Sequence, residues 1–328
     1  MGEVVQKDKN RVAGCAGRAP ARMAVAALAL AALAALASGC GLSGDLSGSG
    51  SGSDPSVKPA SGQQNGGPQN GGPQNGGPQD AAARQRAERQ AVVAAAKRWG
   101  LKTPPLTPPA PPAEKPAITT RDGFEVDGHV EEGLPPVFTT IPTREKVVFL
   151  TIDDGAEKDP EFLRMMSELK VPYTAFISDY LVKEDYAHFK DMQARGVVLN
   201  NHTLDHPYLP GLSYEQQKHE ICGMQDVIEK RYGKRPVLFR PPFGNYNKDT
   251  LVAAKACGIT YAPLWNEEVF VDHWEYREWD RDLHPGDIVL SHFRGRDDWE
   301  GTMPDMIRLF LDKVTEKGYA VGRLEDYL

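Results

Sequence analysis

The sequence has 328 residues, of which 40% are hydrophobic and 25% are charged, and its formal net charge is −7. This length allows one large domain or two small ones. The acidic balance argues against a nucleic-acid partner, because contacts to phosphates need clustered Lys and Arg, and it suits a neutral substrate better than an anionic one. Nearly all the aromatic residues lie from Phe124 onward, so a core is expected in the second half of the chain.

The first 40 residues have the three parts of a secretory signal. A basic region ends at Arg22, and an apolar run over residues 23–37 is shorter than the roughly 20 residues that a transmembrane helix needs. The Ala-Ser-Gly-Cys that ends at Cys40 resembles the bacterial lipobox, whose cysteine is lipidated. We therefore expect residues 1–39 to be a signal peptide and Cys40 to anchor an exported protein to the outer face of the cell membrane. The alternatives are an ordinary cleaved signal peptide with an unrelated cysteine, and a chain that starts at Met23.

Residues 40–118 are expected to form a flexible linker rich in Gly, Ser, Gln and Pro. The sequence Asn-Gly-Gly-Pro-Gln begins at residues 65, 70 and 75, and such repeats behave as flexible coil. An Ala-, Arg- and Gln-rich stretch at 81–99 predicts a short helix, and the Pro-rich residues 103–116 predict an extended chain. The folded domain is expected at residues 119–328.

From Lys146 onward the pattern alternates between strands and helices. Expected strands occupy residues 146–154, 173–178, 197–201, 236–240, 259–264, 287–292 and 319–322. Expected helices occupy residues 159–170, 185–195, 213–232, 247–258 and 304–317, with caps at Asp159, Ser213 and Asn247. Repeated strand–helix units imply an α/β fold with a parallel sheet, either open or closed into a barrel. Active sites of such folds lie at the carboxyl ends of the strands.

Two acidic residues and two histidines lie at such strand ends. Asp153 and Asp154 end the first strand, and adjacent buried carboxylates repel each other unless a cation is present. His202 and His206 follow the third strand. Either pair alone is weak, since Asp-Asp-Gly is usually a turn and a single His-x3-His is often coincidence. Together Asp154, His202 and His206 make the two-histidine, one-carboxylate set of a catalytic zinc-type centre.

Further candidate residues follow the other expected strands. Arg240 begins a stiff Arg-Pro-Pro-Phe-Gly loop and could pair with a carboxylate, although a surface arginine is the plainer interpretation. His292 ends a strand, where a core histidine is the usual case and a proton donor is the functional alternative. Trp265 is a natural platform for a sugar ring, but tryptophan is also common in cores. Asp272 lies in an acidic and aromatic stretch that follows Trp265.

These segments, in this order, resemble the motifs of the polysaccharide deacetylases, which form carbohydrate esterase family four and are homologous to chitooligosaccharide deacetylases. The motifs are Thr-Ile-Asp-Asp-Gly at 151–155, His-Thr-Leu-Asp-His at 202–206, Arg-Pro-Pro-Phe-Gly at 240–244 and Leu-Ser-His at 290–292. The resemblance covers roughly Val137 to the C-terminus, and it implies a distorted (β/α) barrel of seven to eight parallel strands.

The resemblance assigns metal-binding and base roles by position. It implies that Asp154, His202 and His206 bind the metal, that Asp153 is the general base for the attacking water, and that Arg240 tethers this base. Neighbouring residues of a strand point to opposite sides, so we expect Asp154 to face the ion and Asp153 to face the water.

The resemblance also assigns residues that contact the substrate. It implies that His292 is the general acid, that the backbone N–H of Phe243 stabilises the oxyanion, and that Leu290 lines the acetyl pocket. The family motif that orients the acid histidine normally ends in Asp-Trp. Asp272 comes closest to that motif and is assigned to orient His292. The other candidates for this role are Asp280 and Glu268.

The expected function is removal of acetyl groups from N-acetylglucosamine in a polysaccharide, such as peptidoglycan or a chitin-like oligosaccharide, by a monomeric enzyme. The expected cofactor is one divalent metal ion, with zinc preferred and cobalt or nickel as alternatives. Two other hypotheses stay open. One is an esterase for O-acetyl groups on xylan or another glycan, and the other is a catalytically inactive lipoprotein that binds the cell wall.

Cys222 and Cys257 are the two cysteines beyond the expected signal peptide and lipidation site. Export permits a disulfide between them, and two buried free thiols are the alternative.

Overall fold

The computed structural model describes residues 78–121 and 133–328. All of them belong to one of the two units into which the chain divides, Gly71–Leu328. The expected signal peptide, Cys40 and most of the Asn-Gly-Gly-Pro-Gln repeats lie outside the described residues.

The helices of the described residues mostly begin where the sequence places a cap. They are α1 (Pro78–Arg98), α2 (Pro160–Leu169), α3 (Asp179–Val182), α4 (Tyr186–Ala194), α5 (Tyr214–Tyr232), α6 (Lys248–Ala256) and α7 (Met303–Glu316). Asp159 caps α2 by accepting the backbone N–H of Glu161, and Ser213 forms a capping box with Gln216 at the start of α5. Gly233 ends α5 with φ 86°, which glycine adopts without strain. Of these described helices, none combines the length and the apolarity needed to span a membrane.

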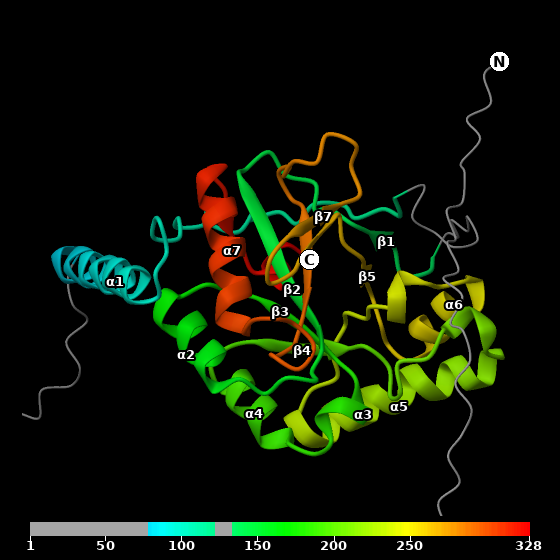
Figure 1. The fold of residues 1–328 in the computed structure, drawn as a ribbon. Coiled ribbons are helices and arrows are strands. Elements are labelled where there is room, and N and C mark those ends of the chain that lie inside the picture. Colours follow the sequence, from blue (N-terminus) through cyan, green and yellow to red (C-terminus); the bar gives the residue numbers. More distant parts are fainter. Residues whose placement is uncertain (1–77, 122–132) are drawn as a thin grey trace, which may run out of the picture. The chain divides into compact units, whose positions relative to one another are not determined.

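The strands form one large sheet and one small sheet (Figure 1). They are β1 (Val137–Phe138), β2 (Val147–Asp154), β3 (Thr174–Ile177), β4 (Val198–Asn201), β5 (Ala262–Pro263), β6 (Glu267–Val269), β7 (Trp274–Tyr276), β8 (Ile288–His292) and β9 (Ala320–Val321). The large sheet has the order β4-β3-β2-β8-β6-β7, with β9 also paired to β2, and the small sheet joins β1 to β5. β7 runs antiparallel to β6, and all the other pairings between these strands are parallel.

Short bridges connect the two sheets into an irregular ring. Asn201 of β4 bridges to Phe239, and Leu238 bridges to Tyr261 just before β5. The chain just after β1 bridges in turn to Asp287, which precedes β8. The ring agrees with the expected α/β fold and with a distorted barrel, but the expectation of parallel strands alone is wrong, because β7 runs antiparallel to β6.

Two strands expected from the sequence are much reduced in this ring. Residues 236–240 contribute only isolated bridges, and residues 259–264 contribute one bridge and the two-residue strand β5. Pro236, Pro241 and Pro263 lie in or beside these segments, and proline cannot donate a backbone hydrogen bond to a neighbouring strand.

Alternation along β2 separates the interior of the barrel from the layer under the helices. Val147 and Phe149 belong to the interior cluster, which also contains residues of β1, β5 and β8. Val148, Leu150 and Ile152 belong to the cluster shared with α2 and α7. β2 is buried along its whole length, because the chain covers both of its faces.

Residues 78–118 do not behave as the flexible linker that the sequence predicts. α1 contacts α2 (Figure 1) and buries Val92, Ala95 and Ala96. The Trp99 indole N–H donates to Glu168 at 2.8 Å, and the backbone N–H of Lys102 donates to a carboxylate on α7 at 3.0 Å. The helix itself was expected, but its small alanine side chains gave no sign of a packed face.

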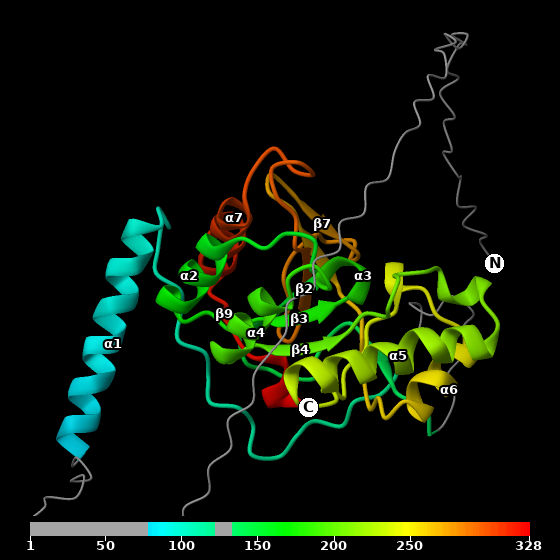
Figure 2. The same cartoon turned by 90° about the horizontal axis from the view of Figure 1, so that it is seen from below.

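A disulfide joins Cys222 of α5 to Cys257, which directly follows α6. The two helices lie side by side in both views of the fold (Figures 1 and 2). The small core around the disulfide includes Phe239 and Ile259, which belong to the part of the ring that is closed by bridges.

Candidate metal centre and active site

Asp154, His202 and His206 bring three potential metal ligands together, with one ligand atom of each within 4.8 Å of the others. Asp154 Oδ1 lies 3.7 Å from His202 Nε2 and 3.5 Å from His206 Nε2. This oxygen is buried and has no hydrogen-bond partner among the described residues. Burying a carboxylate oxygen without a partner is unfavourable, and a cation between these atoms removes that cost. The three side chains therefore fit a divalent metal ion of the zinc type.

His202 is oriented for this role by its neighbours. Its Nδ1 lies 2.7 Å from the backbone carbonyl oxygen of Arg240, so Nδ1 carries the proton and donates it, while Nε2 keeps a lone pair facing Asp154. Burial lowers the pKa of His202 to about 3, and burial also lowers the pKa of His206. Both rings are therefore neutral at pH 7, which is the form that binds metal ions.

The loop that carries the two histidines is strained. Thr203 and His206 have φ of 73° and 55°, in the left-handed region that residues with a side chain rarely adopt. The backbone N–H of Thr203 donates to Asn201 Oδ1 at 2.9 Å, and the backbone N–H of His206 donates to Thr203 Oγ1 at 3.0 Å. These bonds stabilise a conformation that brings both imidazoles to one point, and such strain is typical of functional sites.

Asp153 and Asp154 do not point to opposite sides as strand alternation predicts. Asp154 has φ 79°, which turns its side chain back toward Asp153. Asp153 Oδ2 and Asp154 Oδ1 consequently lie 3.6 and 3.7 Å from the same atom, His202 Nε2. The two carboxylates differ instead in their cations, because Asp153 is bonded to Arg240 and Asp154 to Arg294.

Arg240 is fully buried, so it is not the surface arginine of the plainer interpretation. Its Nη1 donates to Asp153 Oδ1 at 2.8 Å and to Thr151 Oγ1 at 2.9 Å, and its other nitrogens donate to the backbone carbonyls of residues 263 and 264. Burial raises the pKa of Asp153 above the ordinary carboxyl value, and the charge of Arg240 offsets part of this rise. Asp153 is thus held in place and accepts a proton more readily than an exposed carboxylate does.

His292 lies at the end of β8 and is oriented by Glu268. Its Nδ1 lies 3.1 Å from Glu268 Oε1 on the neighbouring strand β6. Burial works to lower the pKa of His292, but the hydrogen bond to Glu268 and the charges of Asp154 and Asp153 outweigh it and raise the pKa above the ordinary value. A histidine that keeps its proton near neutral pH is suited to act as a proton donor.

Asp272, which the sequence analysis assigned to orient His292, lies elsewhere. Its side chain is 76% exposed and contacts His273. The antiparallel pairing of β6 and β7 explains this, since it places Asp272 in the turn between them, away from β8. Asp280 pairs with His284, so of the three acids considered it is Glu268 that meets His292.

A cavity of about 330 Å³ opens over these side chains. It is lined by Asp153, Asp154, His202, His206, Phe243, Trp265, Glu268, Leu290, His292 and Arg294. Phe243, Trp265 and Leu290, which were expected to contact the acetyl group or the sugar, therefore share one cavity with the metal-ligand set. Phe243 has φ 61° and is 59% exposed as a residue, so this strained turn forms the rim of the cavity.

Arg294 is the site residue that the sequence analysis did not find. Its Nη2 donates to Asp154 Oδ2 at 2.6 Å, and its side chain lines the cavity. It lies two residues after His292 on the chain that leaves β8, where a single arginine forms no recognisable motif. Its charge balances the second oxygen of Asp154 and leaves Oδ1 for a metal ion.

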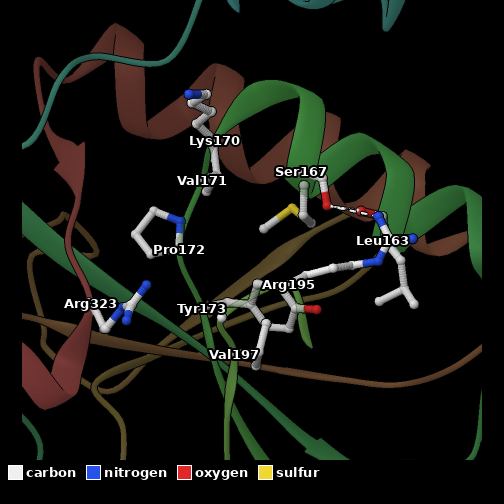
Figure 3. Close-up of a pocket in the computed structure, with 11 residues that line it drawn as sticks. Leu163, Ser167, Lys170, Val171, Pro172, Tyr173, Arg195, Val197 and Arg323 are labelled. Atoms are coloured by element: carbon white, nitrogen blue, oxygen red, sulfur yellow. Dashed lines mark hydrogen bonds between the residues drawn. The ribbon is translucent and has the colours of Figure 1, made fainter. Parts of the chain in front are cut away.

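A larger cavity, of about 500 Å³, lies at the opposite ends of the strands (Figure 3). Tyr173 and Val197, which directly precede β3 and β4, line it together with the cations Lys170, Arg195 and Arg323. It contains none of the predicted site residues. Since parallel α/β folds place their chemistry at the carboxyl ends of strands, the smaller cavity is the candidate active site.

Comparisons with known sequences indicate the family to which the chain is similar. The family model of polysaccharide deacetylases matches residues 140–262. An uncharacterized protein of Streptomyces coelicolor is 41% identical over 199 residues, which are 60% of this chain and 78% of that protein. The peptidoglycan-N-acetylmuramic acid deacetylase PdaA of Bacillus subtilis is 28% identical over 198 residues, 57% of this chain and 73% of PdaA. The peptidoglycan-N-acetylglucosamine deacetylase of Bacillus cereus is 29% identical over 202 residues, 57% of this chain and 91% of that enzyme.

Proposed function

Because the chain belongs to the polysaccharide deacetylase family, we propose that it removes acetyl groups from N-acetylglucosamine units of peptidoglycan or of a chitin-like oligosaccharide. One observation carries this proposal. A two-histidine, one-carboxylate set shares a cavity with a buried carboxylate tied to an arginine and with a histidine tied to a glutamate. These are the groups that hydrolysis of an acetamide needs.

The cofactor in this proposal is one divalent ion held by Asp154, His202 and His206, with zinc preferred and cobalt or nickel as alternatives. When bound, such an ion supplies Lewis acidity for the acetyl carbonyl and for a water molecule. Asp153 accepts the proton of the attacking water, and Arg240 keeps Asp153 in position through the 2.8 Å hydrogen bond.

The remaining residues act on the substrate. His292 donates a proton to the amine nitrogen as the carbon–nitrogen bond breaks, and Glu268 holds its ring in place. The backbone N–H of Phe243 stabilises the negative charge that develops on the acetyl oxygen. Leu290 contacts the acetyl methyl group, and Trp265 provides an apolar wall for the sugar.

The pairing of His292 with Glu268 favours an N-acetyl over an O-acetyl substrate. An amine is a poor leaving group unless it is protonated, whereas an alkoxide leaves with less help from an acid. The presence of the whole ligand set and of Asp153 disfavours a catalytically inactive wall-binding protein.

The two named relatives act on different sugars, since one is a deacetylase of N-acetylmuramic acid and the other of N-acetylglucosamine. We propose N-acetylglucosamine for this chain because its net charge of −7 suits a neutral sugar better than one that carries a carboxylate.

The experiment that tests this function is acetate release from a panel of glycans by chelator-treated protein, with and without added zinc. The panel contains peptidoglycan, chitooligosaccharides and acetylated xylan. We expect zinc-dependent release from the N-acetylated glycans. Release from xylan alone would support the esterase, and no release from any glycan with zinc bound would support the inactive form.

We also propose that Cys40 is lipidated and tethers the exported domain to the outer face of the cell membrane. The basic region, the apolar run and the Ala-Ser-Gly-Cys at residues 37–40 support this. Cys40→Ala should move the protein from the membrane fraction to the soluble fraction. Unchanged fractionation would contradict the anchor.

A further inference from the structure

A second group of potential metal ligands lies outside the cavity, and we refer to Glu267, His284 and Asp287 as the second cluster. One ligand atom of each lies within 4.8 Å of the others. Glu267 begins β6 and Asp287 directly precedes β8, so the cluster joins two neighbouring strands. Glu267 and Asp287 are fully buried, whereas the side chain of His284 is 44% exposed and opens the cluster to solvent.

Glu267 is the residue in the second cluster whose polar atoms lack a partner. Neither of its carboxylate oxygens has a hydrogen-bond partner among the described residues. The group that it faces, Asp287, is itself a carboxylate. Two buried carboxylates in contact need either a shared proton or a shared cation, because two negative charges repel strongly where water is excluded.

The other two members are already positioned by their own bonds. Asp287 Oδ2 accepts the backbone N–H of His284 at 2.5 Å, and Asp287 Oδ1 accepts the side-chain N–H of Asn266 at 3.2 Å. His284 Nδ1 lies 3.4 Å from Asp287 Oδ2, while its Nε2 lies 3.1 Å from Asp280. A carboxylate at the far nitrogen of a ligand histidine is typical of metal sites, because it fixes the ring and makes it a better donor.

Arg121 belongs to the hydrogen-bond network beside the second cluster. Arg121 donates to Asn266 Oδ1 at 3.1 Å and to Thr139 Oγ1, and it forms an ion pair with Glu278. The side-chain amide of Asn266 links the two, because it accepts from Arg121 and donates to Asp287.

The second cluster repeats the feature that marks the first metal-ligand set. There, a buried oxygen of Asp154 without a partner faces two imidazoles. Here, the buried oxygens of Glu267 face a carboxylate and an imidazole. From this geometry we propose that Glu267, His284 and Asp287 bind a second divalent metal ion.

The ligand set indicates the class of ion. Two carboxylates and one imidazole suit zinc or manganese, whereas calcium prefers six to eight oxygen ligands. An ion here ties the start of β6 to the start of β8. Glu268, the next residue of β6, reaches His292 at the far end of β8, so the second ion also fixes the distance on which the acid pair depends.

The test counts metal ions on the full chain. Chelator-treated protein is titrated with ZnCl2 alone by calorimetry, and bound zinc is counted after dialysis. We expect about two zinc ions per chain for the wild type, and about one for Glu267→Gln, for His284→Ala and for His206→Ala. One ion in the wild type, or two in both Glu267→Gln and His284→Ala, would overturn the proposal and leave a shared proton as the explanation.

Two controls separate this site from adventitious binding and from misfolding. His273→Ala removes an exposed histidine that contacts Asp272, and this variant should still bind two ions. If it loses one instead, the second ion belongs to that surface group and the proposal fails. Zinc should also raise the melting temperature of His206→Ala, which keeps the second cluster, and it should have no such effect on a His206→Ala, Glu267→Gln double variant. If zinc raises the melting temperature of the single and the double variant equally, the proposal is overturned.

Discussion

The two ligand clusters, Asp154-His202-His206 and the second cluster, lie toward opposite ends of β8, and they differ in their surroundings more than in chemistry. Both combine buried carboxylate with imidazole, and both contain carboxylate oxygen that lacks a partner among the described residues. The first lies under a cavity of about 330 Å³ next to a base and an acid. None of the residues of the second lines that cavity, although the side chain of His284 is 44% exposed. The difference indicates that an open cavity beside the ligands, rather than the ligands themselves, is what suits a site to catalysis.

The largest expected effect comes from Asp153, the proposed base beside the ligands Asp154, His202 and His206. Asp153→Asn should lower the rate of acetate release by about 10²- to 10⁴-fold, because general-base catalysis contributes roughly that much. It should keep zinc at Asp154, His202 and His206, since Asp153 is tied to Arg240. His206→Ala is the matched variant that should lose activity together with the zinc ion of this site, while the ion proposed at the second cluster stays bound. If Asp153→Asn binds one zinc ion fewer than the wild type while Asp154→Asn binds as many, the roles of the two aspartates are reversed.

Glu268 follows Glu267 of the second cluster and contacts His292 of the active site. Its substitution should have the next largest effect on the rate. Glu268→Gln removes the carboxylate that raises the pKa of His292, so His292 should lose its proton at a lower pH. We expect the alkaline limb of the pH–rate profile to move to lower pH and the rate at pH 8 to fall by about 10-fold. Asp272→Asn is the control, because its exposed side chain contacts His273 rather than His292. A larger effect of Asp272→Asn than of Glu268→Gln would restore the sequence-based assignment.

Removal of α1 should lower the stability of the fold and leave zinc binding at both clusters unchanged. A chain that starts at Ile118 loses the buried contacts of Val92, Ala95, Ala96 and Leu101. We expect a loss of roughly 2–4 kcal/mol in the free energy of unfolding, measured by urea denaturation. Zinc stoichiometry should stay that of the full chain. An unchanged free energy of unfolding would mean that α1 is the flexible segment that the sequence predicts.

The smallest expected effect is the pH dependence of stability in the metal-free protein. Burial and the neighbouring Asp287 raise the pKa of Glu267 from 4.5 to about 10. Between these values the folded chain holds a proton that the unfolded chain has lost, so stability falls as pH rises. Melting temperatures from pH 5 to 9 in chelator should therefore fall more steeply for the wild type than for Glu267→Gln. Parallel curves would show that Glu267 keeps no extra proton on folding, and added zinc should flatten the wild-type curve.

The sequence predicts most of this site because its residues follow long, well-delimited elements. Asp153, Asp154, His202 and His292 each lie at or beside the end of a buried strand of four to eight residues, and parallel strands bring such ends together. The capped helices were likewise predictable from Asp159, Ser213 and Asn247.

What could not be predicted depends on local backbone geometry and on short strands. β6 and β7 have three residues each, too few for a periodic signal, and only their hairpin shows that Glu268 rather than Asp272 reaches His292. The positive φ of Asp154 overrides strand alternation, and the residue type at this position does not predict such a backbone conformation. The packing of α1 depends on alanines that are equally common on exposed helices.

The position of the disulfide has a consequence for how the barrel opens. Between β4 and β1 the ring is closed by isolated bridges and a two-residue strand, so few backbone amides there are protected by paired neighbours. The covalent link between α5 and the end of α6 spans this same sector. In this sector the disulfide should therefore limit local opening. In the other sectors the hydrogen bonds between paired strands should do so. Under reducing conditions, amide hydrogen exchange should accelerate first in residues 237–264, which include Arg240 and directly precede Trp265, while β2 stays protected.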